Sequence, residues 1–448
     1  MKKKKVFFLS LGCDKNLVDS EMMLGMLEES GYIFTDDENE ADVVIVNTCC
    51  FIGDAKEESV NAILEMAELK KNGSVRALIV TGCLGQRYQA EIRQEIEEVD
   101  AVIGTTAIEE LPAVLDEVFA GRAKDHYQSL ESKPLTDRKR IVTTGGHFAY
   151  LKIAEGCDKH CTYCIIPKVR GPYRSVPMDS LLREAETLVS QGVKELILVA
   201  QETTVYGRDL YGYKALSELL RRLARIEGLL WIRVMYCYPE EIDDGLIQVM
   251  REEEKICHYL DIPVQHASDA ILKRMGRRTN KKELTEIINK LRREIPDICL
   301  RTTLITGFPG ETDQDHEELM DFVEEMAFDR LGVFTYSQEE DTPAAEMPDQ
   351  VSEELMQERQ DELMALQQEI AFDAAAQMEG RIVDAMIEGR VADEEAYVAR
   401  TYKDAPDVDG FLFVHTDREL MTGDFVRVRI TGSNEYDLMG ELEDESAK

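Results

Sequence analysis

Three cysteines, Cys157, Cys161 and Cys164, lie close together in the middle of the chain with the spacing C-x3-C-x2-C. Thiolates bind soft metals, and cysteines this near in sequence can share one metal ion or one cluster. Structural zinc usually takes four ligands, but no fourth cysteine lies nearby, although His160 lies between them. A three-thiolate site fits an iron–sulfur cluster with one iron open to a non-protein ligand. A zinc site, or three unrelated thiols, is the alternative.

Three further cysteines follow apolar runs in the first third of the chain. Residues 6–12 lead into Cys13, residues 43–48 into Cys49 and residues 77–82 into Cys83. Such runs are typical of strands buried in a parallel sheet, whose ligands bind at the carboxyl ends of the strands. The pattern predicts a second three-thiolate site, with buried core cysteines as the alternative. Cys50 adjoins Cys49, but neighbouring residues point in opposite directions, and the other two strands favour Cys49.

The elements around these cysteines alternate between strand-like and helical patterns. Helical patterns over residues 19–29 and 54–71 separate the first three strands, which predicts a doubly wound α/β domain. Residues 109–142 predict a last helix followed by a polar, solvated linker.

Six strand-like runs with amphipathic stretches between them follow the linker and predict a partial (βα)6 barrel. The runs cover residues 148–154, 195–200, 231–236, 258–264, 298–305 and 331–336. Functional residues of such barrels lie at the carboxyl ends of strands. The polar or glycine residues near these ends are Gln201, Glu202, His266, Gly307 and Gly310, and Arg233 lies within the third strand. His266 is equally well interpreted as a hydrogen-bonded core residue.

The spacing of apolar residues changes again in the last part of the chain. Residues 352–379 form a helical pattern, and short strand-like runs over residues 382–387, 396–400, 410–414 and 424–430 then predict a small β-barrel. Residues 376–448 hold 18 Asp and Glu against 8 Lys and Arg, a balance of −10. RNA binding needs a basic face, so this acidic segment favours a basic protein partner.

The whole chain has 448 residues and a net charge of −37, which suggests several domains and little affinity for nucleic acid. Ten cysteines without a secretory signal indicate a reducing compartment, and we expect the cytoplasm. No apolar stretch is long enough to span a membrane.

The C-x3-C-x-aromatic-C pattern, with Tyr163 as the aromatic residue, resembles the signature of the radical S-adenosylmethionine (SAM) superfamily. This resemblance implies a 4Fe-4S cluster on Cys157, Cys161 and Cys164 that cleaves SAM to a 5'-deoxyadenosyl radical. Tyr163, Gln201, Glu202, Arg233, Gly307 and Gly310 would then line the SAM pocket.

With the second cysteine set, the chain resembles the methylthiotransferase family. The motifs are Leu11-Gly12-Cys13-Asp14-Lys15-Asn16, Asn47-Thr48-Cys49 and Thr81-Gly82-Cys83, and the end of the chain resembles a TRAM domain. The family implies an auxiliary 4Fe-4S cluster on Cys13, Cys49 and Cys83, and a second SAM as methyl donor. The expected division is residues 1–120 for the N-terminal domain, 121–142 for the linker, 143–375 for the radical SAM domain and 376–443 for TRAM.

Within the family, Ile165-Ile166-Pro167 and Pro263-Val264-Gln265-His266 resemble the branch that methylthiolates the β-carbon of an aspartate in small-subunit ribosomal protein S twelve. This branch implies 3-methylthioaspartate as product, a cellular reductant and no direct tRNA binding. One alternative is a tRNA methylthiotransferase acting on a modified adenosine. A more distant one is an iron–sulfur electron carrier or zinc-stabilised scaffold without SAM chemistry.

Overall fold

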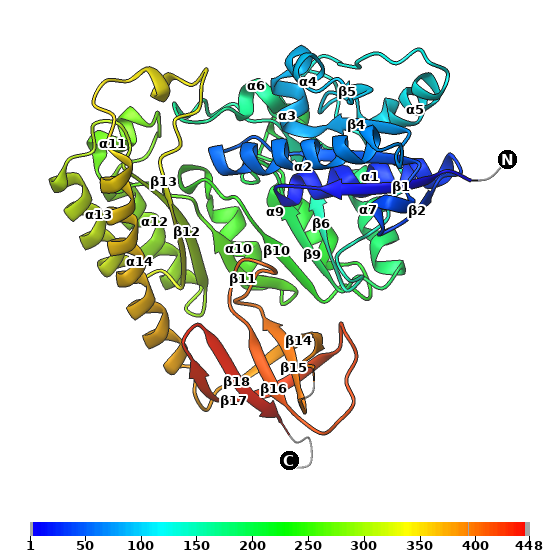
Figure 1. Ribbon diagram of the computed structural model, residues 1–448. Helices are drawn as coiled ribbons and strands as arrows, with labels where there is room; N and C mark the ends of the chain where they lie inside the picture. Colours follow the sequence, from blue (N-terminus) through cyan, green and yellow to red (C-terminus); the bar gives the residue numbers. More distant parts are fainter. Residues whose placement is uncertain (1–2, 393, 444–448) are drawn as a thin grey trace.

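The computed structural model describes residues 3–392 and 394–443. Figure 1 shows an α/β unit at the N-terminal end, a larger central sheet, and a small C-terminal barrel on the far side of that sheet. The three predicted architectures, and their order along the chain, are confirmed.

The N-terminal sheet is parallel and has the strand order β2-β1-β3-β4-β5. Its strands are β1 (Lys5–Ser10), β2 (Ile33–Phe34), β3 (Val43–Thr48), β4 (Ala77–Thr81) and β5 (Ala101–Ile103). Alternate residues of β3 pack on opposite faces. Val44 packs with α2 (Gly53–Lys71), and Ile45 packs with α1 (Asp14–Glu29) and α5 (Leu111–Phe119). Helices thus cover both faces, which explains why the central strands are apolar throughout.

Helix α1 begins at Asp14, directly after Cys13, whereas the sequence predicted a start at Asp19. Its first turn buries the polar residues Lys15 and Asn16, so the apolar period gives no sign of these residues being helical. The earlier start makes Cys13 the N-cap residue of the helix.

The segment between the first two domains is not a plain solvated connector, as the sequence had predicted. Arg140 is buried, and its guanidinium donates to Glu21 of α1 (Nε–Oε2, 2.6 Å) and to Glu184 of α7, Met178–Ser190 (Nη1–Oε1, 2.9 Å). This arginine therefore joins the N-terminal domain to the central one. Charged residues in a linker sequence do not reveal such a partner because both carboxylates are far away in sequence.

The central sheet is also parallel, with the order β13-β12-β11-β10-β9-β6. Its strands are β6 (Phe148–Lys152), β9 (Glu195–Val199), β10 (Trp231–Val234), β11 (Ile256–Asp261), β12 (Cys299–Thr306) and β13 (Arg330–Thr335). The edge strands β6 and β13 do not pair, so the barrel is partial, as predicted. Strand β11 ends at Asp261 rather than near Val264, because Pro263 has no amide hydrogen for the ladder.

Capping residues in the sequence determine where two of the helices on the outside of this sheet begin. Asn280 and Glu283 form a capping box that begins α12 (Lys281–Glu294), and Thr312 and Asp315 do the same for α13, Asp313–Met326. The other connecting helices are α9 (Leu216–Ala224) and α10 (Asp244–Glu252), and α14 (Glu353–Ala376) runs from the sheet toward the C-terminal barrel (Figure 1). Their apolar faces form one large core with the outer face of the sheet.

The C-terminal barrel is closed, in the order β14-β15-β16-β18-β17. Its strands are β14 (Ile382–Arg390), β15 (Ala396–Thr401), β16 (Leu412–His415), β17 (Phe425–Asn434) and β18 (Asp437–Leu442). The sequence predicted the first four, but not β18, which closes the barrel between β16 and β17. Gly440 weakens the strand pattern of β18 in the sequence. In the structure, a Cβ at position 440 would lie 2.4 Å from Val428 Cγ1. Close packing therefore requires the glycine.

A buried ion network joins this barrel to the amino-terminal ends of the central strands. Glu195 of β9 accepts from Arg233 of β10 (Oε1–Nε, 2.8 Å) and from Arg400 of β15 (Oε2–Nη2, 2.8 Å). Burial opposes ionisation, but the two guanidinium groups hold the pKa of Glu195 below its usual value. Arg233 also donates to the carbonyl of Tyr402 at 2.6 Å.

We expect the Glu195→Gln substitution to destabilise this junction by about 3–5 kcal/mol, because it leaves two buried guanidinium groups without their shared counter-charge. Denaturant unfolding followed by tryptophan fluorescence measures it, since Trp231, the single tryptophan, lies 4.7 Å from the Phe425 ring at the same junction. The control is Glu252→Gln, whose exposed pair with Arg221 should contribute less than about 1 kcal/mol. Equal losses in both variants would contradict the prediction.

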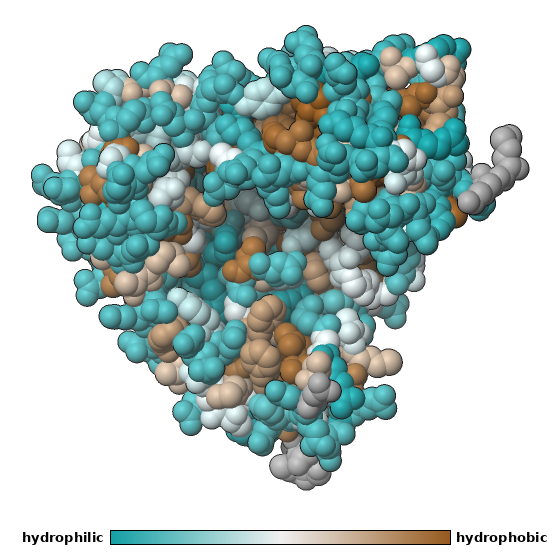
Figure 2. All heavy atoms as spheres, viewed as in Figure 1, coloured by the Kyte–Doolittle hydropathy of each residue, from teal (hydrophilic) through white to brown (hydrophobic). Residues whose placement is uncertain are grey.

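The surface seen in Figure 2 is mostly hydrophilic, in keeping with 89 acidic and 52 basic residues, and is hollowed between the N-terminal domain and the C-terminal barrel. Among the helices of the described residues, none combines the length and the apolar character needed to cross a membrane.

Candidate active site

The loop with Cys157, Cys161 and Cys164 follows β7 (Ala154–Glu155) and leads into α6, Ile166–Arg170. Gly156 begins the loop with φ of 76°, and a Cβ at this position would lie 2.1 Å from the Pro172 carbonyl oxygen. Only glycine fits there. Thr162 anchors the middle of the loop by donating its amide to the Met275 carbonyl at 2.9 Å. The three thiols are thus presented by a fixed backbone.

Burial governs the chemistry of these thiols. Cys157 and Cys161 are buried and Cys164 is half-buried. Burial raises the pKa of the Cys157 thiol to about 12, and burial beside Cys161 also raises that of Cys164. Neutral thiols must lose their protons to bind metal, so loading such a site releases protons. His160 is exposed, with φ of 52°, and serves as a turn residue.

The second set of cysteines lies at the carboxyl ends of three neighbouring strands of the N-terminal sheet. Cys13 follows β1, Cys49 follows β3, and Cys83 lies in α3 (Gly82–Arg87) directly after β4. A Cβ at Gly12 would lie 2.8 Å from the Cys49 sulfur, so the first two loops touch. The topology therefore brings together residues that are far apart in sequence.

Burial differs within this second set. Cys13 is exposed, whereas Cys49 and Cys83 are buried. Burial, with Cys83 nearby, raises the pKa of Cys49 to about 12, and burial raises that of Cys83 although Arg170 opposes it. Cys50 is buried in the apolar core under β3 and β4.

The geometry of the two cysteine sets bears on which metal group they could hold. Among the described residues, no three His, Cys, Asp or Glu side chains converge on a position for a single metal ion. Each set nevertheless places three thiols near one another, since neighbouring thiols contribute to the pKa shifts of Cys49 and Cys164. Grouped thiolates are the ligands that hold iron–sulfur clusters, so both cysteine sets fit such a cluster.

Glu202 lies three residues after the end of β9 and lines a cavity of about 350 Å³ beside the loop of Cys157, Cys161 and Cys164. Burial raises the pKa of Glu202 to about 7, although Lys159 (Nζ–Oε1, 3.4 Å) opposes the shift. Lys159 also forms an ion pair with Glu241 (Nζ–Oε1, 2.8 Å). The neighbouring Gln201 donates to Glu155 at 3.2 Å and leaves its own oxygen without a partner among the described residues. These groups can bind a small polar cation.

Two residues near the cysteine loop were missed by the sequence analysis. The Tyr238 hydroxyl lies 3.8 Å from the Cys161 sulfur, and the Arg277 guanidinium lies 4.4 Å from the Tyr238 ring centroid. The buried Nε and Nη1 of Arg277 have no hydrogen-bond partner within residues 3–392 and 394–443. Such a guanidinium suits a carboxylate ligand. Arg277 follows a short helix rather than a strand, so its position in the sequence gave no signal.

The turn after β12 supports the loop from the other side. Phe308 packs edge-on against Tyr163, with 6.4 Å between the ring centroids. Gly307 (φ 71°) and Gly310 (φ 82°) were expected to allow a ligand to approach, but a Cβ would meet Met356 at 2.2 Å and Arg274 at 2.6 Å. The protein's own side chains therefore explain both glycines.

His266 and Arg233 lie away from the cysteine loops. His266 is fully buried, accepts the Ser268 amide at Nδ1 (3.0 Å) and lies 3.6 Å from Glu311, which fits a core histidine. Arg233 points toward the C-terminal barrel, where it bonds Glu195 and two carbonyl groups. Its position inside a strand, rather than at the carboxyl end, accounts for this orientation, and its described hydrogen bonds go to Glu195 and the C-terminal barrel.

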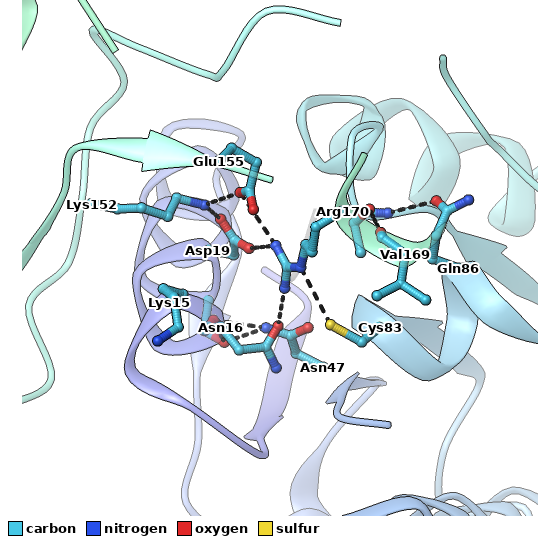
Figure 3. Close-up of polar contacts among 12 residues, drawn as sticks. Lys15, Asn16, Asp19, Asn47, Cys83, Gln86, Lys152, Glu155, Val169 and Arg170 are labelled. Atoms are coloured by element: carbon cyan, nitrogen blue, oxygen red, sulfur yellow. Dashed lines mark hydrogen bonds and ion pairs between the residues drawn. The ribbon is translucent and has the colours of Figure 1, made fainter. Parts of the chain in front are cut away.

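One side chain connects the two cysteine sets. Arg170 ends the helix that follows Cys164, and its Nε lies 3.3 Å from the sulfur of Cys83 (Figure 3). This arginine therefore joins the helix after Cys164, in the central domain, to a cysteine of the N-terminal domain.

Comparison with protein families gives three matches along the chain. Residues 5–104 match the family described as "Uncharacterized protein family UPF0004", residues 151–323 match the radical SAM superfamily, and residues 380–442 match the TRAM domain. Each match lies on one of the three sheets described above.

Curated relatives cover the whole length. "Ribosomal protein uS12 methylthiotransferase RimO" from Lachnoclostridium phytofermentans is 61% identical over 98% of this chain and 100% of the relative. The protein of the same name from Acetivibrio thermocellus is 49% identical over 100% of both. Among solved structures, the radical SAM methyltransferase TsrM from Kitasatospora setae matches with a TM-score of 0.56 and 13% identity, covering 76% of this chain and 74% of that one. This last likeness concerns the fold alone.

Proposed function

Because the chain belongs to the family of ribosomal protein uS12 methylthiotransferases, we propose that it methylthiolates the β-carbon of an aspartate in uS12, the small-subunit protein S twelve. The product is 3-methylthioaspartate. The chain is a radical SAM methylthiotransferase that uses 4Fe-4S clusters and SAM. The observation that carries the proposal is full-length identity of 61% to a relative of that name.

Two sets of residues hold the clusters in this proposal. Cys157, Cys161 and Cys164 hold the radical SAM cluster, and Cys13, Cys49 and Cys83 hold the auxiliary one. When bound, the clusters supply the electron for reductive cleavage of SAM and the sulfur for transfer. A β-carbon of aspartate is unactivated, so hydrogen abstraction by a radical replaces removal by a general base. A cellular reductant supplies the electrons.

The chain's own residues bind and orient the ligands. The proposed pocket for SAM retains Tyr163, Gln201 and Glu202 and gains Arg277 and Tyr238. The Glu202 carboxylate would hold the ammonium group of SAM, and the free nitrogens of Arg277 would hold its carboxylate. Gly307 and Gly310 act indirectly, by placing Phe308 against Tyr163. Residues 1–120, 143–375 and 376–443 remain the proposed domains, joined by residues 121–142.

The charge of the chain supports a protein substrate. The net charge is −37, and the C-terminal segment contributes −10 to it (18 acidic against 8 basic residues over 376–448). Such a surface repels phosphate and attracts a basic protein. We therefore propose no direct binding of tRNA and, since the substrate is a ribosomal protein, a cytoplasmic location. An assay that offers uS12 and tRNA as competing acceptors tests the proposal.

We expect SAM affinity to fall several-fold between pH 7.5 and pH 6, because Glu202, with a pKa of about 7, becomes protonated and loses the charge that pairs with the ammonium group. Equilibrium dialysis of SAM against the cluster-loaded chain measures this. The Glu202→Gln variant should bind weakly at both pH values and lose this dependence. A pH dependence that survives in the variant would show that another group causes it.

A further inference from the structure

Arg170 is a buried cation with every contact directed at the junction of the two cysteine sets. Its side chain is 2% exposed. Nε donates to the Cys83 sulfur at 3.3 Å, and Nη2 donates to the side-chain amide oxygen (Oδ1) of Asn16 at 2.9 Å. Nη1 donates to Asp19 at 2.6 Å and to Glu155 at 3.4 Å. Figure 3 shows the guanidinium lying between these groups, with the sulfur on one side and the carboxylates on the other.

The arginine comes from the helix that follows one cysteine loop and contacts a cysteine of the other set. It ends α6, the helix that follows Cys164, whereas Cys83 and Asn16 belong to helices of the N-terminal domain. The guanidinium group is planar, so its N–H donors point in fixed directions relative to one another. Arg170 therefore fixes the position of the Cys83 thiol relative to the loop of Cys157, Cys161 and Cys164.

Charge around this group is balanced. Lys152 pairs with Asp19 and, at 2.8 Å, with Glu155, so two cations face two carboxylates. Removing the charge of Arg170 would leave one excess negative charge beside Cys83. In a buried site such a charge is poorly screened.

We propose that Arg170 raises the reduction potential of the auxiliary cluster, and that it does so through the Cys83 ligand. Hydrogen bonds to ligating sulfur and nearby net charge both set the potentials of iron–sulfur clusters. A positive donor at the sulfur stabilises the reduced cluster, which carries one more electron. Arg170 is thus a positioning residue that makes one-electron reduction easier. This inference rests on the proposed function, because it requires that Cys83 is a ligand.

The test uses the full chain with only the auxiliary cluster, obtained with Cys157→Ala, Cys161→Ala and Cys164→Ala. Into this background we place Arg170→Gln, Arg170→Lys or Arg140→Gln. Arg140 is the matched control, because it is also buried and joins α1 to the central domain through carboxylates, but has no bond to a cysteine within the described residues. Iron content, circular dichroism and a dithionite titration followed by electron paramagnetic resonance are recorded for each protein.

We expect the midpoint potential to be lowest in Arg170→Gln, intermediate in Arg170→Lys, which keeps the charge but loses the planar set of N–H donors, and unchanged in Arg140→Gln. An unchanged potential in an iron-loaded Arg170→Gln protein would overturn the inference. If Arg170→Gln takes up no iron, the Arg170→Lys variant is used instead, and an unchanged midpoint potential in that variant would likewise overturn the inference. Absence of iron from the background protein itself would instead overturn the assignment of Cys13, Cys49 and Cys83, and the inference with it.

Discussion

The Cys83→Ala substitution is expected to abolish methylthio transfer while the chain still cleaves SAM. Cys83 belongs to the proposed auxiliary set, whereas Cys157, Cys161 and Cys164 lie on a separate loop of the central domain. The reconstituted variant should therefore hold about four iron atoms per chain instead of about eight. It should form 5'-deoxyadenosine, but no methylthiolated product detectable by mass spectrometry. Replacing any of the other five proposed ligand cysteines should also abolish the product.

Cys50→Ala is the matched control for this experiment. Cys50 adjoins Cys49, is buried and shares an apolar cluster with Cys83, but it is not one of the three proposed ligands. Removing a small buried sulfur should cost some stability and leave the iron content and the product in place. Full product and wild-type iron content in Cys83→Ala would contradict the assignment of the auxiliary site. Loss of about four irons in Cys50→Ala would point to Cys50 as the ligand instead of Cys49.

The second large effect concerns the choice of acceptor. With SAM and a reductant, the anaerobically reconstituted chain is expected to add one methylthio group to an aspartate of uS12 and none to tRNA that lacks the modification. The physical reason is the excess of acidic over basic residues, 89 against 52, which disfavours contact with phosphate. Mass spectrometry of both acceptors in one reaction reads the result.

The control for this assay is a uS12 loop peptide in which alanine replaces the target aspartate, which should gain no mass. Because the attraction between an acidic enzyme and a basic protein is screened by salt, the rate on uS12 should fall as ionic strength rises. Methylthiolation of tRNA alone would leave the fold and both cluster sites in place. It would show that the charge of the C-terminal barrel does not select the substrate.

Much of the fold was predictable because its signals are local. Continuous apolar runs indicated the buried parallel strands, and their alternation with helices indicated the architecture of the first two domains. The errors have local causes too. Helix α1 begins with buried polar residues that break the apolar period, and β11 ends early because of Pro263. Strand β18 was missed because Gly440 weakens a short pattern that only barrel closure makes stable.

The sequence by itself determined the two cysteine sets, since C-x3-C-x2-C is a spacing within one loop and the other three cysteines each end an apolar run. Only the tertiary structure decided which distant side chains serve them. Arg170 reaches Cys83 across 87 positions, and Arg233 turns away from the cysteine loops toward residues of the C-terminal barrel. Periodicity and spacing describe neighbours along the chain, whereas the partner of a buried charge depends on how whole domains pack. That packing sets which guanidinium meets a thiol and which meets a carboxylate.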